Sequence, residues 1–308
     1  MTSPHAPRRL VIASRESALA LSQARHVQTR LQALYPRAVV EMFVTSQRAR
    51  ASDVTASGDG HAKDLHAALA EGRADVVVHA LRDVPLTVGD EFVIAAIEAR
   101  DDARDALLSM RYNALAALPP GAIVASTRSC CQLQLRERRP ALDVRHVVIE
   151  SGEAVRGLHD DRIHAIVMPV ADAKSLGLGD LVCDLIDAAD LLPAPGQGVL
   201  ALQCRADRAD VIASLAPLND RATELAAIAE RAFAHALAGG SQTPLAAHAA
   251  WQEGSLWLRG LIGTSDGARV VRGEREREIV DADDAHALGA ELADDLLTHG
   301  AGRLIVND

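Results

Sequence analysis

Apolar positions along the chain alternate between short continuous runs and stripes with helical spacing. The runs at 10–13, 39–44 and 76–78 predict three buried strands. Between the first two, apolar side chains recur at intervals of four and three residues, which indicates an amphipathic helix: Ala20, Ala24, Val27, Leu31 and Leu34. A second helix at 62–71 precedes the third strand. This strand–helix order predicts a parallel sheet with right-handed crossovers.

The same alternation returns in the middle of the chain. Strands are expected at 122–125, 144–149 and 163–168, and helices at 129–138 and 153–159. Two such units in succession predict two lobes with a cleft between them. The strand 199–204 follows a loop rich in proline and glycine, and we expect it to return to the first lobe.

The last third of the chain has a different pattern. It contains a long alanine-rich helix at 220–237, and then strands near 244–251, 255–262 and 269–274, a helix at 285–298 and a final strand at 303–306. The fold class is therefore α/β, with two α/β domains and a small C-terminal α+β domain. The expected boundaries are 1–103 with 199–218, then 104–198, then 219–308.

The segment HALRDVP at 79–85 carries the most chemistry. Pro85 cannot donate to a strand ladder and disfavours helix at Val84, so Arg82 and Asp83 lie at the carboxyl end of the valine-rich strand. Open α/β sheets bind their ligands at that edge. There, a carboxylate can stabilise a developing cation while a guanidinium holds an anionic substrate. A surface ion pair in a turn is the alternative interpretation.

Composition and charge exclude several classes of protein. The 308 residues carry a net charge of −10 without a basic stripe, which argues against nucleic acid as a partner. The N-terminus lacks the apolar segment of a signal peptide and no apolar run is long enough to span a membrane, so we expect a cytoplasmic protein without membrane contact. The four cysteines have no CxxC spacing, and the histidine pairs lie five residues apart, so no metal site is expected.

Several collinear stretches resemble the porphobilinogen deaminase (hydroxymethylbilane synthase) family. They include IASRESALALSQA, GRADVVVHALRDVP, RDDARDALLS, QLRERRP, LPAPGQGVLALQCR and ERAFAHALAGGSQTPLAAHA. The resemblance implies two domains like those of bacterial periplasmic binding proteins, a third domain, and an active site in the cleft. It also implies tetrapyrrole biosynthesis, in which four porphobilinogen units are joined head to tail with loss of ammonia. The growing chain is carried on a dipyrromethane cofactor attached to a cysteine thioether.

The resemblance also assigns roles to residues. Asp83 matches the catalytic aspartate that stabilises the cation left when ammonia departs. The positions expected to bind substrate or cofactor carboxylates, directly or as stand-ins, are Arg15, Ser17, Arg82, Thr127, Arg128, Arg156 and Gln197.

The chain departs from the family at the positions that carry the cofactor and the anions. Ser241 stands where the family has its cofactor cysteine. Cys130 and Cys131 align with two arginines, and Glu150 aligns with a third, which reverses the charge. Arg82 replaces a lysine, and SGDG at 57–60 lacks the lysine usual in that loop. We therefore expect dipyrromethane to be absent from this chain.

Three hypotheses remain open. The leading one is a diverged paralogue with lost or strongly impaired thioether-cofactor activity, which still binds a small polycarboxylate pyrrole or another anion in the interdomain cleft. The second is an active synthase with a modified anchor, for which Ser241 or the Cys130–Cys131 pair are candidates. The third is a non-catalytic protein that binds a small polyanion or a partner protein. A monomer is expected.

Overall fold

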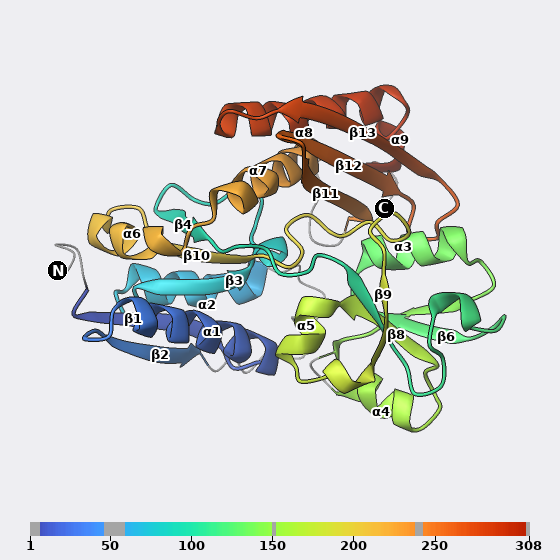
Figure 1. Cartoon of the computed structure of the whole chain (residues 1–308), viewed down its shortest axis with the longest axis horizontal. Coiled ribbons are helices and arrows are strands. Elements are labelled where there is room, and N and C mark those ends of the chain that lie inside the picture. Colours follow the sequence, from blue (N-terminus) through green and yellow to red (C-terminus); the bar gives the residue numbers. More distant parts are fainter. Residues whose placement is uncertain (1–6, 46–58, 150–151, 238–242, 306–308) are drawn as a thin grey trace. The chain divides into compact units, whose positions relative to one another are not determined.

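The structure is a computed structural model that describes residues 7–45, 59–149, 152–237 and 243–305 (Figure 1). The chain divides into two compact units, one formed by 1–100 with 199–224 and the other by 101–198 with 225–308. Each unit is built around its own sheets, and the second contains two of them. The expected division into three separate domains stays a prediction.

The first unit contains a five-stranded mixed sheet. Its order is β2 (Val39–Thr45), β1 (Arg9–Arg15), β3 (Val76–Ala80), β10 (Leu200–Arg205) and β4 (Phe92–Ile97). β10 lies in this sheet, which confirms that the chain returns to the first lobe. The three strands expected to be parallel, β1, β2 and β3, are parallel. β10, whose direction was not predicted, runs antiparallel to both β3 and β4, so the sheet is mixed. β4 was not predicted.

Helices α1 (Ala18–Leu34), α2 (Asp59–Ala70) and α6 (Ala209–Leu215) belong to the same unit. α1 buries the apolar stripe expected from the sequence, except that Leu34 is exposed at its end. Its side chains Ala24, Val27 and Leu31 join Leu10 and Ile12 of β1 in one hydrophobic cluster. A short 3-10 helix, η1 (Leu81–Asp83), ends β3, and Val84 is extended as expected before a proline.

The second unit holds another five-stranded mixed sheet. Its order is β7 (Asp143–His146), β6 (Ile123–Ser126), β8 (Ala165–Pro169), β5 (Asp105–Leu108) and β9 (Val182–Ile186). The expected strands and helices of this region are present, with α3 at Ser129–Arg138 and α4 at Glu153–His159. The short helix α5 (Val170–Ser175) was not predicted. β5 and β9 were missed. β5 runs antiparallel to β8, which makes this sheet mixed too.

The other sheet of this unit is antiparallel, with the order β11 (Leu245–Gln252), β12 (Ser255–Gly263) and β13 (Val270–Glu278). α7 (Arg221–Ala236) and α8 (Ala282–Thr298) lie beside it in Figure 1. Gly260 leaves room for the ring of Phe233, since a Cβ there would lie 2.4 Å from it. The expected final strand is wrong: Gly302–Ile305 forms the short helix α9, and residue 306 lies outside the described residues.

Candidate functional site

Arg15 and Asp83 lie at the same edge of the first unit's sheet. Arg15 is the last residue of β1, and Asp83 follows the neighbouring parallel strand β3 by three residues. The Asp83 side chain is 48% exposed, so its carboxylate is open to solvent. The carboxylate expected to stabilise a cation and the guanidinium expected to bind an anion therefore share the carboxyl edge of two parallel strands, where α/β sheets bind ligands.

Arg82 and Ser17 are less available than the sequence suggested. The Arg82 side chain is only 12% exposed, and its Nε lies 3.7 Å from Asp83 Oδ1, a loose ion pair. The Ser17 Oγ accepts a hydrogen bond of 3.3 Å from the Ala20 N–H and caps α1. Its hydroxyl proton is still able to donate to a ligand.

His79 is a neighbour of this edge that sequence reasoning did not single out. Burial lowers its pKa to about 4, opposed by a hydrogen bond to Gln203, and Arg15 and Asp83 shift it in opposite directions. His79 Nε2 lies 3.1 Å from Gln203 Oε1, and His66 Nε2 lies 2.9 Å from the same oxygen. The imidazole is therefore neutral at pH 7. Its place inside HALRDVP was the available signal.

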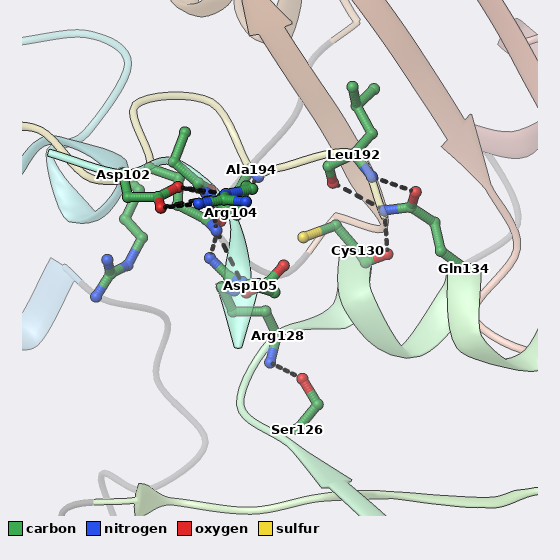
Figure 2. Close-up of polar contacts among 12 residues, drawn as sticks. Asp102, Arg104, Asp105, Ser126, Arg128, Cys130, Gln134, Leu192 and Ala194 are labelled. Carbon is green, nitrogen blue, oxygen red and sulfur yellow. Dashed lines mark hydrogen bonds and ion pairs between the residues drawn. The ribbon is translucent and has the colours of Figure 1, made fainter. Parts of the chain in front are cut away.

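In the second unit, Arg128 lies against Asp105 (Figure 2). Its guanidinium also donates to the Gln197 side chain. Arg128 is the N-cap residue of α3, and its Nη2 lies 2.5 Å from Asp105 Oδ1. The two side chains are 13% and 1% exposed. Burial raises the pKa of Asp105 while Arg128 opposes that rise, and Asp105 in turn raises the pKa of Arg128 against the effect of burial. We treat the two groups as a charged pair.

Gln197 connects this pair to the loop before β10. Its Oε1 accepts hydrogen bonds from Arg128 and from the Ala194 N–H, and its Nε2 donates to the Ala103 carbonyl at 2.7 Å. The residue is completely buried. The structure thus brings together two of the predicted binding residues, Arg128 and Gln197. It adds Asp105, which sequence reasoning missed although it lies in the matching stretch RDDARDALLS.

Cys130 and Cys131 are buried beside the same pair. Cys130 packs with Leu133, Leu192 and Ala246, and Cys131 belongs to the core of the sheet that contains β6. Burial raises the pKa of both thiols, that of Cys131 well above its ordinary value. Both are close enough to Arg128 to raise its pKa. Neither thiol is suited to nucleophilic attack at neutral pH, because the thiolate is the reactive form.

The local charge around Arg128 does not favour an anion. Asp105 is in direct contact, and Asp172 of α5 also raises the Arg128 pKa through its charge. Asp172 is 5% exposed. One guanidinium thus faces two buried carboxylates, so the attraction that it offers to a ligand carboxylate is already offset.

The remaining predicted positions are spread out or undescribed. Thr127 is half-buried between β6 and Arg128, and Arg156 is exposed on α4. Glu150, Ser241 and most of the 45–60 loop lie outside the described residues. The cofactor-attachment and charge-reversal calls therefore stay predictions.

The described residues offer neither a cluster of metal ligands nor a helix that could span a membrane. No group of three or more histidine, cysteine or acidic side chains there could hold a metal ion. None of the helices in those ranges is both long and apolar enough to cross a bilayer.

A cavity of about 270 Å³ lies beside the start of α3. Its lining includes Ser129, Gln132, Arg136 and His146. Arg136 already donates to the carbonyls of Ser265 and Val144, and the Gln132 Nε2 lies 3.0 Å from both the Ser126 carbonyl and His146 Nδ1. With these groups engaged, the cavity is a weaker candidate than the edges described above.

Comparison with known protein families gives two matches that together span most of the chain. Residues 10–213 match the family model described as "Porphobilinogen deaminase, dipyromethane cofactor binding domain". Residues 224–298 match "Porphobilinogen deaminase, C-terminal domain".

Curated relatives include porphobilinogen deaminases from Burkholderia mallei (strain SAVP1), Burkholderia pseudomallei (strain 668) and Burkholderia thailandensis. Each is 43% identical over 304 residues, which cover 97% of this chain and 92% of the relative.

Solved structures to which the chain is similar include the methionine-binding protein MetQ, at 15% identity and a TM-score of 0.44, over 69% of this chain and 90% of MetQ. A periplasmic substrate-binding protein of an ABC transporter from Coxiella burnetii matches at 14% identity and a TM-score of 0.44, over 72% of this chain and 96% of that one.

Proposed function

Because the chain belongs to the porphobilinogen deaminase family of tetrapyrrole biosynthesis, we propose that it is a diverged paralogue with lost or strongly impaired thioether-cofactor activity. It would bind a small polycarboxylate pyrrole or a related anion with an affinity well below that of an intact family member. The family's chemistry needs a thiolate to carry the growing chain and a set of cationic side chains to hold its acetates and propionates.

The observation that carries this proposal is the state of the segment 128–131. Arg128 is the residue expected to stand in for the missing arginines, and its guanidinium is already paired with the Asp105 carboxylate. The next candidates, Cys130 and Cys131, are neutral thiols that are 4% and 1% exposed. In the family, this segment is expected to offer several cationic side chains to a ligand. Here, residues 128–131 contain one cationic side chain, and its charge is offset by Asp105.

The residues present do not fit a thioether-linked dipyrromethane. Ser241 offers a hydroxyl, of which almost none is ionised at neutral pH, so it is a far weaker nucleophile than a thiolate. The buried thiols of Cys130 and Cys131 do not replace it, because their raised pKa keeps them protonated. We therefore derive no catalytic step through this cofactor.

The first unit retains some of the side chains that the family is expected to use for binding and catalysis. Arg15 and the exposed carboxylate of Asp83 share one sheet edge, and Arg82 keeps the positive charge of the lysine that it replaces. This edge supports residual binding of a single anionic pyrrole. It also favours, as the second candidate function, an active synthase that uses a modified anchor.

A turnover assay separates the two candidates. Purified protein is incubated with porphobilinogen, and the hydroxymethylbilane formed is compared with that from the Burkholderia thailandensis relative. Two lost charge-assisted hydrogen bonds and one reversed charge weaken the binding free energy by on the order of 5 kcal/mol. We therefore expect a rate of hydroxymethylbilane formation that is lower by a factor of roughly 10³ or more. A rate within about tenfold of the relative, a difference of only about 1.4 kcal/mol, would favour the modified-anchor synthase.

A further inference from the structure

β11 is an edge strand whose outward amides are satisfied from outside its sheet. Among the described residues, β12 is the one strand with which β11 pairs. On its free side the Ala247 N–H donates to the Pro193 carbonyl at 3.0 Å, and the Ala249 N–H donates to Glu230 Oε1 at 2.8 Å. Pro193, in the segment that leads into the Gln197 turn, thus accepts one of the two edge hydrogen bonds, and the Glu230 side chain of α7 accepts the other.

Glu230 of α7 is the side chain that completes this edge, and it also reaches the turn itself. Its side chain is 0% exposed. Oε2 accepts a hydrogen bond of 2.7 Å from the Gly196 N–H, while Oε1 takes the Ala249 N–H and lies 3.5 Å from His248 Nδ1. The two carboxylate oxygens thus join two backbone segments that lie 53 residues apart. A buried carboxylate is costly unless such donors surround it, so its contacts define one geometry.

The Gly196 amide is next to the functional side chain. Gly196 and Gly198 have φ angles of +73° and +75°, a conformation that favours glycine, so the turn around Gln197 is tight. The Gln197 N–H closes this turn on the Ala194 carbonyl at 3.0 Å. From there the Gln197 side chain reaches Ala103, Ala194 and Arg128. A shift of the Gly196 amide would move this side chain.

We infer that Glu230 is the positioning residue of the candidate site in the second unit. It holds the 194–198 turn against β11 so that Gln197 contacts Arg128. Glu230 opens the matching stretch ERAFAHALAGGSQTPLAAHA, but it was not singled out, because a glutamate within an alanine-rich helix is usually a surface residue. The inference is independent of the proposed loss of cofactor loading, since it concerns the geometry of Gln197 and not turnover.

Residue-resolved amide hydrogen exchange on the full chain tests this assignment. Glu230→Gln keeps the volume and one acceptor oxygen, but it turns an NH₂ group toward one of the two amides. We expect exchange at the Gln197 N–H to accelerate by about tenfold or more, while Leu258 in the central strand β12 stays within about twofold. Glu291→Gln, the same substitution on the partly exposed face of α8, is the matched control and should change neither amide.

The outcomes are decisive in both directions. Acceleration confined to the turn supports positioning, because a purely structural role would speed exchange at Leu258 as well. Unchanged exchange at Gln197, or equal acceleration at both sites, overturns the inference. Should Glu230→Gln not fold, Glu230→Asp serves in its place, because it keeps the charge beside His248 but is one methylene too short to reach both amides. The same two results then decide the question.

Discussion

Arg128 Nη2 lies 2.5 Å from Asp105 Oδ1, in a contact where the two side chains are 13% and 1% exposed. This ion pair determines how much positive charge the start of α3 can offer to a ligand. It turns the guanidinium expected to bind a ligand into one that is already bound within the protein. Removing either partner leaves an uncompensated charge in a largely dry environment.

The first prediction follows from that pair. Asp105→Asn should lower the free energy of unfolding by about 3–5 kcal/mol, because Arg128 then keeps its charge without a counter-charge. The control is Asp190→Asn, whose pair with Arg138 is 3.4 Å long and whose own side chain is 73% exposed; its loss should cost under about 1 kcal/mol. Urea unfolding of the three proteins measures both. Similar small losses for the two variants would show that the Arg128–Asp105 pair is not a buried ion pair in solution.

The second prediction concerns pH and His79. Burial lowers its pKa from 6.5 to about 4, so the unfolded chain binds this proton more readily than the folded protein does. The resulting loss of stability begins as the pH falls below about 6.5 and is complete below about 4. At pH 5 it amounts to about 2 kcal/mol for this residue. Above pH 6.5 His79 is neutral in both states and contributes no pH dependence.

His79→Asn isolates that contribution, because asparagine does not titrate. The difference in unfolding free energy between pH 7.5 and pH 5 should be about 2 kcal/mol smaller for the variant than for the parent protein. Equal pH dependence of the two proteins would mean that the His79 imidazole takes up its proton in the folded state.

The third prediction concerns the cysteines. Burial raises the pKa of Cys130, Cys131 and Cys204, the last to about 11, and all three are buried. Cys183 is exposed, although burial of part of its side chain raises its pKa too. Iodoacetamide at pH 7.5 should therefore label Cys183 at least about tenfold faster than the others, with a rate that rises as the pH is raised toward the pKa.

Peptide mapping after timed labelling measures the four rates. Denatured protein is the control, in which the rates should converge. Fast labelling of Cys130 or Cys131 in the folded protein would contradict their burial. It would support the hypothesis that one of these two cysteines anchors a pyrrole chain.

The parts of the fold that the sequence predicted are those with strong local patterns. The bounds of α3 and α4 follow directly from apolar spacing and breakers, and the extended conformation of Val84 follows from the proline at 85. β5 was missed because its four residues carry no pattern of their own, and their ladder partners lie in β8 and β9, about 60 to 80 residues later. The segment 303–306 was predicted as a strand because of its apolar, β-branched residues, but local hydrogen bonds after Gly300 place residues 303–305 in α9.

The sequence predicts those parts of the candidate site that depend on the position of a residue in a strand, and not those that depend on contacts between residues far apart in the chain. The placement of Asp83 and Arg15 at one sheet edge follows from the strand order. The Arg128–Asp105 contact does not, because a composition of one arginine and one aspartate, 23 positions apart, says nothing of their distance. The role of Glu230 could not be predicted for the same reason. Glu230 lies on α7, whereas its hydrogen-bond partners Gly196 and Ala249 lie in a loop and in β11.

The fourth prediction concerns repair at position 241. Ser241→Cys supplies a nucleophile but leaves Cys130, Cys131 and Glu150 at the positions expected to hold the substrate's carboxylates. Hydroxymethylbilane formation by this variant should therefore stay roughly 10³-fold below that of an intact relative, since about 5 kcal/mol of anion binding is still missing. Ser241→Ala is the control and should match the parent. Near-normal turnover from Ser241→Cys alone would mean that the chain is one substitution from an ordinary deaminase.

The most direct test of the account is the intact mass of the purified protein. The chain is produced in a host that makes porphobilinogen, and the Burkholderia thailandensis relative is purified in parallel as the positive control. Because Ser241 lacks the thiol that the family uses, we predict the mass calculated from the sequence alone, with no covalent addition. A mass increased by a dipyrromethane group would contradict the account, and peptide mapping would then identify the residue that carries it.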